Sequence, residues 1–348
     1  MGYTSKNNRR PFESASKASH HHIINDAEVQ AVMKRLEEPP QADDVSVEQL
    51  IEDFEPSENN PVEAIIAVDG GYTEVILNKD FPSRTIHFLQ FGALFFKLED
   101  LAEIDSSAFI DPKDMAKLKK IQRLKLALPT RNLCFKDSRT LKDTVLKAIY
   151  EFCLNNDLDE DKTLIDTLAW FIFRKYKQGQ ITEQDKCYYL ATNPLSPDGN
   201  QVRLLEAEMN IDYSFNCPET GGKIYLTDIF RLHEVIDEET GAAGILGYLV
   251  NVIEHLIIIH LIRLLYNKQP EMLKKVLFIK DGSTGFFGQT ARLHVPMKDL
   301  VNWLFNKHNV LLAGLEKSGA FVDHAQNMQN QLQPGKALIA FLGLMRYT

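Results

Sequence analysis

The sequence predicts an α/β protein in which helices flank a mixed β-sheet, and three observations favour this fold class. Short β-branched and apolar runs that end in turn residues occur at 62–68 and 276–279, which is typical of buried strands. The segment at 241–275 is apolar nearly all round, as expected of a helix inside the molecule. The chain of 348 residues is 44% hydrophobic, so it can bury a sizeable core in one large domain or two smaller ones.

The first 60 residues form a polar, irregular arm. One helix is predicted at 26–36, with Asn25 as its N-terminal cap and two prolines after its end. Eleven acidic residues lie between positions 26 and 58 against two basic ones, a local balance of −9. Because the arm has little apolar surface, we interpret 1–60 as a linker or partner-docking segment and 61–348 as the folded domain.

The folded domain is predicted to begin with a β-meander. Its first two strands are expected to form a hairpin whose turn is Asp69-Gly70-Gly71, so that Asp69 ends the first strand. An Asp-Gly pair by itself is common in hairpin turns and need not have a function. The functional interpretation is that the glycines leave Asp69 uncrowded, where a metal ion and a phosphate can approach. The predicted strands are 62–68, 73–77, 85–91 and 94–98.

An inserted helical lobe is predicted at about 100–185, with helices at 112–127, 139–155 and 162–177. Between positions 113 and 147 there are eleven Lys and Arg against three Asp, a balance of +8. A charge run of this kind is most often a solvated helix face. The alternative is a phosphate-binding surface. In that case the candidate nucleic-acid-binding residues are Lys117, Lys120, Arg123 and Arg131.

A carboxylate, Glu254, falls inside the apolar helix. A buried carboxylate without a partner costs several kcal/mol, roughly 2–7, so we expect Glu254 to be protonated, paired with a base or bound to a cation. The structural interpretation is an ion pair with Arg263 or a histidine. A second carboxylate, Asp281, follows the next strand and favours a functional role for both.

The C-terminal part predicts one more helix and one more strand. A helix at 297–308 has Trp303 and Phe305 on its buried side, and a buried strand at 310–315 is followed by Lys317. Three strand ends therefore carry Asp69, Asp281 and Lys317. Sheets that contain parallel strands place functional groups at such ends.

Composition excludes several classes of protein. The four cysteines lie far apart in the sequence without a CxxC pair, so neither a zinc site nor a disulfide framework is indicated. No signal peptide opens the chain, and the helix around Glu254 is too polar to face lipid. We expect a cytoplasmic protein without a membrane partner.

Four segments together resemble the NurA nuclease family over residues 62–324: AVDGG at 67–71, the helix with Glu254, the strand and DGS at 276–283, and the strand and KSG at 310–319. The resemblance implies a ribonuclease H-like sheet, Mn²⁺ or Mg²⁺ as cofactor, and exonucleolytic or endonucleolytic cutting of DNA. It also implies a homodimer docked on a hexameric HerA-type ATPase translocase, in repair of DNA ends or in defence against phage. The family's C-terminal histidine-bearing helix has no clear counterpart in this chain, and His324 is a poor substitute.

The resemblance also implies a two-metal mechanism. Carboxylates are the oxygen ligands that hold Mg²⁺ or Mn²⁺, and two such ions activate a water and neutralise the charge of the transition state. Asp69 would bridge both ions, while Glu254 and Asp281 would each complete one coordination shell. Lys317 would contact the scissile phosphate or the attacking water. Its structural interpretation is an ordinary lysine in solvent.

Two other functions are consistent with the sequence. The Asp69-Gly70-Gly71 segment after a strand also suits the phosphate loop of an actin-like phosphotransferase or ATPase. A net charge of −9 disfavours binding of free DNA, which fits a non-catalytic docking subunit of a DNA translocase.

Overall fold

The computed structural model describes residues 25–36, 51–55, 59–102, 119–159, 162–196, 199–319, 322–323, 325–326 and 332–338. The chain divides into two compact units, residues 1–56 with 323–348 and residues 57–322. In the first unit, the helix α2 begins after Asp26, whose side chain caps it, and not after Asn25 as predicted. Its strands β1 and β13 pair in antiparallel register, with Glu52 opposite Ala337.

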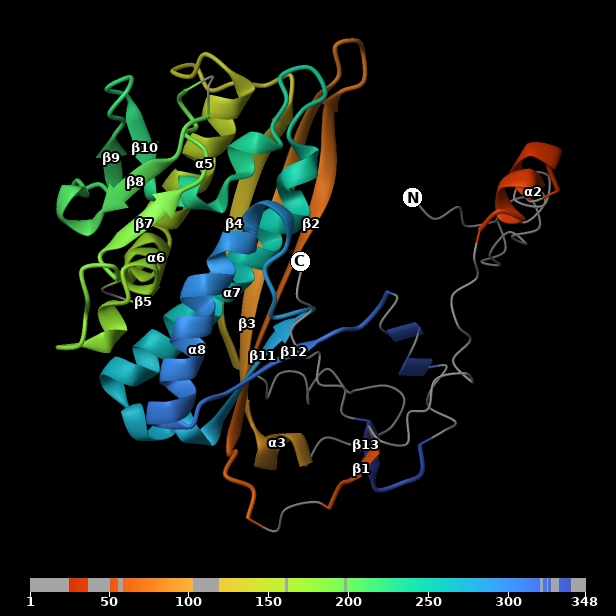
Figure 1. Cartoon of the computed structure of the whole chain (residues 1–348), viewed down its shortest axis with the longest axis vertical. Coiled ribbons are helices and arrows are strands. Elements are labelled where there is room, and N and C mark those ends of the chain that lie inside the picture. Colours follow the sequence, from red (N-terminus) through yellow and green to blue (C-terminus); the bar gives the residue numbers. More distant parts are fainter. Residues whose placement is uncertain are drawn as a thin grey trace. The chain divides into compact units, whose positions relative to one another are not determined.

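The elements follow one another along the chain as shown in Figure 1. In chain order, the helices and strands are α2 (Ala27–Met33), β1 (Ile51–Asp53), β2 (Ala64–Asn78), β3 (Arg84–Lys97), α3 (Leu98–Ala102), β4 (Lys119–Arg131), α5 (Leu141–Asn155), β5 (Asp157–Asp159), β6 (Lys162–Thr163), α6 (Leu164–Ile172), β7 (Cys187–Leu190), β8 (Val202–Leu205), β9 (Ser214–Asn216), β10 (Lys223–Tyr225), α7 (Leu246–Lys268), β11 (Val276–Asp281), α8 (His294–His308), β12 (Leu311–Leu315) and β13 (Lys336–Leu338). Short 3₁₀ helices are η3 (Lys175–Lys177), η4 (Glu206–Glu208), η5 (Leu226–Phe230), η6 (Leu232–Glu234), η7 (Ala243–Ile245), η8 (Pro270–Lys275) and η9 (Gly288–Leu293).

A five-stranded mixed sheet organises the second unit, in the order β12-β11-β2-β3-β4. The strands β12, β11 and β2 are parallel to one another, whereas β2, β3 and β4 form an antiparallel meander. The predicted class, a mixed sheet flanked by helices, is confirmed.

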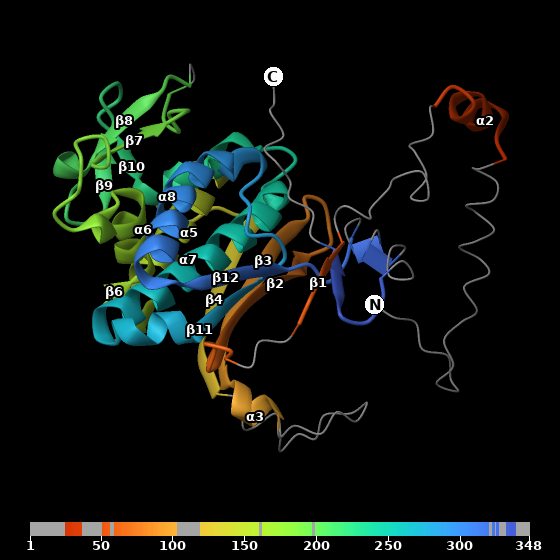
Figure 2. The same cartoon turned by 60° about the horizontal axis from the view of Figure 1, so that its bottom comes forward.

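The longer helices of this unit lie on one face of the sheet, as Figure 2 shows. The helix α5 packs on β4, α7 packs on β2, β3 and β11, and α6 contacts both α5 and α7. Residues on alternate positions of β2 and β3 point into this core, beginning with Ala64, Ile66 and Val68 of β2. We call the opposite face, where the intervening residues point, the open face.

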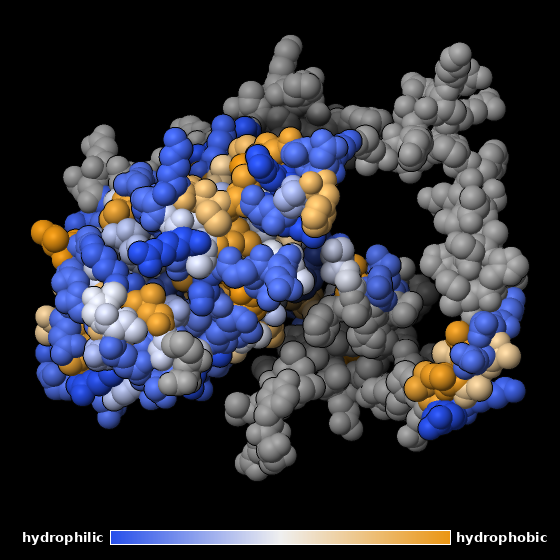
Figure 3. All heavy atoms as spheres, turned by 90° about the horizontal axis from the view of Figure 1, so that it is seen from above, coloured by the Kyte–Doolittle hydropathy of each residue, from blue (hydrophilic) through white to orange (hydrophobic). Residues whose placement is uncertain are grey.

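The helix α7 runs through the middle of the core. It is long and apolar enough to cross a membrane, but 78% of its most apolar stretch of 18 residues is buried inside the protein. This is the position of a core helix. The surface in Figure 3 accordingly carries mostly hydrophilic residues with scattered hydrophobic ones.

The hairpin predicted at Asp69-Gly70-Gly71 is wrong. The strand β2 continues through these residues for 15 positions, and Asp69, Gly70 and Gly71 pair with Gly92, Phe91 and Gln90 of β3. The segments 85–91 and 94–98 likewise form the single strand β3. Glycine tolerates extended backbone as well as turn conformations, so two glycines in succession do not decide between them. Asp69 therefore lies within a long strand and not at its end.

The helix predicted at 112–127 is also wrong where the structure describes it, because 119–131 form β4. Its leucines 124, 126 and 128 are buried while Arg123 and Lys125 are exposed, which is the period of two of a strand. The helices predicted at 139–155 and 162–177 are found as α5 and as α6 followed by η3. They contribute to the same core as α7, so this part of the predicted lobe is built into the domain.

The C-terminal elements agree with the sequence prediction in most respects. The strand β11, the helix α8 and the strand β12 occupy the predicted positions. Trp303 packs against the core as predicted, but Phe305 is 60% exposed. The strand β12 is the edge of the sheet and is only partly buried, since it has a neighbour on one side alone.

Candidate active site

Two carboxylates meet on the open face of the sheet. The parallel register of β11 and β2 places Lys280 opposite Val68, so the next residues, Asp281 and Asp69, come side by side. Their carboxyl groups are within hydrogen-bonding reach of each other. The Asp69 side chain is 68% exposed and the Asp281 side chain 27%, so both face solvent.

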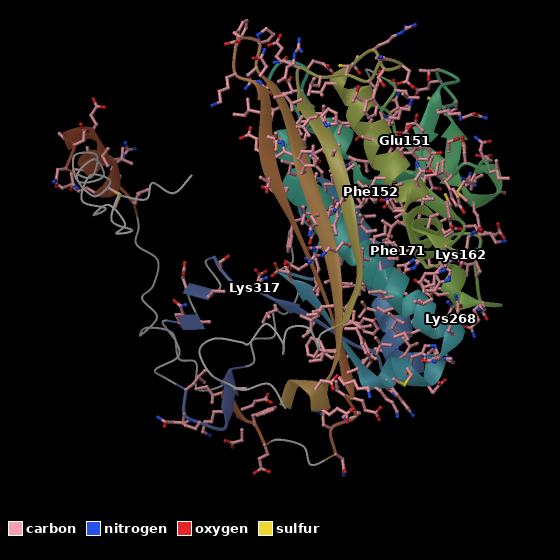
Figure 4. The ribbon with its side chains drawn as sticks, turned by 180° about the vertical axis from the view of Figure 1, so that it is seen from behind. Glu151, Phe152, Lys162, Phe171, Lys268 and Lys317 are labelled. Atoms are coloured by element: carbon pink, nitrogen blue, oxygen red, sulfur yellow. The ribbon has the colours of Figure 1, made fainter. Side chains whose placement is uncertain are left out.

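Lys317 completes this cluster from the segment after β12. Its Nζ lies 2.9 Å from Oδ2 of Asp281 and 3.7 Å from Oδ1 of Asp69. In Figure 4 it lies on the side of the sheet away from α5 and α6, which carry the labelled Phe152 and Phe171. Three of the four predicted catalytic residues, Asp69, Asp281 and Lys317, are therefore brought together.

The two carboxyl groups have different proton affinities. Burial, together with the hydrogen bond to Asp281, raises the pKa of Asp69, although the nearby Lys317 ammonium opposes this. Burial would also raise the pKa of Asp281, but the hydrogen bonds from Asp69 and Lys317 outweigh it and lower that pKa. Asp69 is therefore the member of the pair that binds a proton more readily.

Glu254 lies on the other face of the sheet, beneath this cluster. Its Oε1 accepts a hydrogen bond from the Gly70 N–H at 2.8 Å, and its Oε2 lies 2.8 Å from Nζ of Lys280. Both side chains are almost fully buried, 5% exposed for Glu254 and 3% for Lys280. Burial raises the pKa of Glu254, and the Lys280 ammonium and the Gly70 amide oppose this.

The alternation of side chains along β11 explains this separation. Lys280 and Asp281 are consecutive, so they point to opposite faces: Lys280 meets Glu254 in the core, and Asp281 meets Asp69 on the open face. The structure thus brings Asp69 and Asp281 together and pairs the third expected carboxylate, Glu254, with Lys280. In the described part of the chain, no three His, Cys, Asp or Glu side chains are grouped closely enough to hold a metal ion.

Sequence reasoning missed Lys280. The signal was available, because Lys280 occupies the same alternate positions of β11 as the buried Val276 and Phe278. A lysine on the buried face of a strand requires a buried partner. Glu254 was expected to pair with Arg263 or a histidine, and it pairs with this lysine.

The loop after Asp281 is held on α7. Gly282 has φ of 71°, a left-handed conformation that favours glycine, and its N–H donates to the Leu315 carbonyl at 2.9 Å. Asn251 Nδ2 donates to the Gly285 carbonyl at 3.2 Å. The position of Asp281 is thereby fixed from both sides.

Two hollows adjoin the cluster. A cavity of about 290 Å³ is lined by Glu254, Asp281, Lys317 and Glu316, so Glu254 can be reached from this side. A larger groove of about 660 Å³ extends over the open face from Asp69 to β4. The groove is lined on β2 by Asp69, Gly71 and Thr73, on β3 by Phe88, Gln90 and Gly92, and on β4 by Arg123.

The candidate nucleic-acid-binding residues are placed differently from one another. Arg123 lines the groove that contains Asp69. Arg131 lies at the far end of β4, is exposed, and does not line the groove. Lys120 belongs to β4 by its backbone, and its side chain is not among those that the structure describes. Lys117 and His324 lie outside the described residues altogether.

The fold and this cluster define the protein as a mixed α/β protein with an aspartate pair and a lysine beside an open groove. Comparison of the chain with models of known protein families, with curated proteins and with solved structures finds no match.

The donor set fits a divalent cation at the aspartate pair. Two carboxylates this close repel each other unless a positive charge lies beside them, and Lys317 provides one here. Carboxylate oxygens are also the donors that Mg²⁺ and Mn²⁺ prefer. Glu254 fits less well, because Lys280 and Gly70 already engage both of its oxygens.

Proposed function

We propose that this protein is a Mn²⁺- or Mg²⁺-dependent nuclease that hydrolyses phosphodiester bonds in DNA, as the resemblance to the NurA family implies. The observation that carries the proposal is the Asp69–Asp281 pair beside Lys317, at one end of a groove that reaches Arg123. The mixed sheet is of the kind expected for the ribonuclease H-like fold that we propose for this chain.

The metal would be held by Asp69 and Asp281. When bound, it supplies a more acidic water and neutralises charge that develops on the phosphate. Lys317 places a further positive charge beside the same carboxylates, where it would contact a phosphate oxygen as a point charge. The cation would compete with protons for the oxygens of Asp69, whose pKa is raised.

The groove on the open face offers a path for the DNA strand. Its floor lacks side chains at Gly71 and Gly92, and a methyl group added at either glycine would meet no atom within 4 Å. Phe88 is 50% exposed at the groove and can stack on a base, while Arg123 can bind a phosphate. The chemistry at Asp69 would then act on a backbone held between these groups.

The proposal extends to partners. A net charge of −9 disfavours capture of free DNA, so a hexameric HerA-type translocase that feeds DNA to a homodimer of this protein would supply the substrate. Processing of DNA ends for repair and defence against phage both remain within the proposal.

The actin-like phosphotransferase is less consistent with the geometry. The Asp69-Gly70-Gly71 segment is a paired, extended strand in which the Gly70 amide already donates to Glu254, so it forms no phosphate loop.

Cleavage of linear and single-stranded DNA in Mn²⁺ or Mg²⁺ tests the proposal, with and without a HerA-type translocase. We expect metal-dependent cleavage that Asp69→Asn and Asp281→Asn each abolish, while Glu63→Gln, which changes an exposed carboxylate paired with Lys275, leaves it intact. Absence of cleavage in the presence of the translocase would contradict the nuclease proposal and support a docking subunit. Hydrolysis of ATP in place of DNA would support the phosphotransferase.

A further inference from the structure

We propose that Lys280 is a built-in cation that takes the place of a second metal ion, so that the site binds one divalent cation through Asp69 and Asp281, and Glu254 is a positioning residue. This inference rests on the proposed function, which it changes from a two-metal to a one-metal site.

Both carboxylate oxygens of Glu254 already have a partner. One carboxylate oxygen accepts from the Gly70 N–H and the other contacts the Lys280 ammonium, each at 2.8 Å. A metal ion at Glu254 would lie beside the Lys280 ammonium, and the two positive charges would repel each other unless the ion displaced the lysine. Lys280 is 3% exposed, so its charge would then remain buried with only a carbonyl oxygen as partner. The pair therefore disfavours a metal ion at Glu254.

The Glu254–Lys280 pair also contacts the backbone beside both aspartates. Gly70 directly follows Asp69, and its N–H is fixed by Glu254. Lys280 directly precedes Asp281, and its Nζ also donates to the Asp281 carbonyl at 2.6 Å. One buried ion pair therefore connects the backbone beside both carboxylates of the proposed metal site. This arrangement positions Asp69 and Asp281 relative to each other from the core side of the sheet.

There is little space around the backbone of Gly70. A Cβ added at Gly70 would lie 2.7 Å from Cδ1 of Phe91 and 3.2 Å from Oε1 of Glu254. Glu254 thus packs directly under the strand that carries Asp69, in contact distance of the glycine backbone. Only glycine at position 70 permits this approach.

Binding of Mn²⁺ to the full chain, counted by electron paramagnetic resonance of the free ion, tests the proposal. We expect one Mn²⁺ per chain, with Kd raised at least about 10-fold by Asp69→Asn or Asp281→Asn. Glu254→Gln retains an oxygen that accepts from the Gly70 N–H, so its Kd should stay within about 3-fold of wild type. Glu254→Ala loses that acceptor and should weaken Mn²⁺ binding more than Glu254→Gln does.

A ligand role for Glu254 predicts a different pattern, because an amide is a poorer donor than a carboxylate for these ions. Two Mn²⁺ per chain in the wild type, or equal weakening by Glu254→Gln and Glu254→Ala, would overturn the inference while leaving the proposed nuclease intact. No Mn²⁺ binding at all would overturn both.

The Lys280→Met variant tests the role of the Lys280 ammonium independently. Removing the ammonium frees the Glu254 carboxylate, so we expect a second, weaker Mn²⁺ to bind. A count that stays at one would contradict the role assigned to Lys280. The double variant Glu254→Gln with Lys280→Met, which removes both buried charges, should return to one Mn²⁺, and circular dichroism of each variant verifies that it is folded.

Discussion

Asp69 and Asp281 lie side by side on neighbouring parallel strands, and a hydrogen bond between their carboxyl groups joins residues that are distant in the sequence. Asp69 is the member whose pKa is raised, and Asp281 the member whose pKa is lowered. The oxygens of this pair are therefore a position at which protons and a cation would compete.

Lys317→Met should raise the pKa of both aspartates, because the ammonium favours their charged forms. The pH titration of the carboxyl carbons by NMR measures this. Lys268→Met, a substitution at the end of α7, is the control and should leave both titrations unchanged. An unchanged pKa at Asp281 in Lys317→Met would show that the contact at 2.9 Å is absent in solution.

Lys280→Ala should destabilise the protein by about 3–5 kcal/mol, because it leaves a buried, unpaired Glu254 carboxylate. Lys317→Ala removes a half-exposed ion pair and should change the free energy of unfolding by less than about 1 kcal/mol. Urea unfolding of both variants gives the comparison. Similar values for the two would indicate that Lys280 is not buried against Glu254.

Gly70→Ala should destabilise the protein by about 1–3 kcal/mol, since the new methyl group would overlap the ring of the buried Phe91. Gly71→Ala points into open space and should be neutral or slightly stabilising. Thermal unfolding distinguishes them. Equal tolerance at the two positions would contradict the register of β2 against β3.

Arg123→Ala should weaken binding of a single-stranded oligonucleotide and reduce the slope of log K against log salt by about 0.7 to 1, the amount expected for one lost phosphate contact. Arg131→Ala, on the same strand but outside the groove, is the matched control. Fluorescence anisotropy in EDTA measures binding without cleavage. Equal effects of both variants would point to a general charge effect in place of the groove.

Asp228 provides a test by pH, away from the proposed active site. It is wholly buried, its Oδ1 has no hydrogen-bond partner, and burial raises its pKa to about 7. The folded state therefore keeps a proton that the unfolded state releases above the ordinary value of 3.8. Stability should fall as pH rises from about 4 to about 7, by up to on the order of 4 kcal/mol. Asp228→Asn should flatten this dependence, and a wild-type stability that rises over the same range would contradict the assignment.

Two strands of the sheet and two long helices were predictable from local pattern. The strands β11 and β12 and the helices α5 and α8 were located from apolar runs and turn residues, because their burial follows the period of their own backbone. The strand β4 was missed, although its alternating leucines indicate a strand, because its many lysines and arginines resemble a solvated helix. The two glycines of β2 predict a turn when only the sequence is considered, because their pairing with β3 depends on residues distant along the chain.

The sequence by itself determined that Glu254 is buried and therefore needs a partner, and that Asp281 follows a strand, since both depend on neighbours along the chain. Only the tertiary structure decided which partner each one meets. Side chains alternate across a sheet, so a shift of one residue sends Lys280 to the core and Asp281 to the open face, and pairing between distant strands sets which carboxylate lies opposite. The pairing of Asp69 with Asp281, and of Glu254 with Lys280, depends on that register.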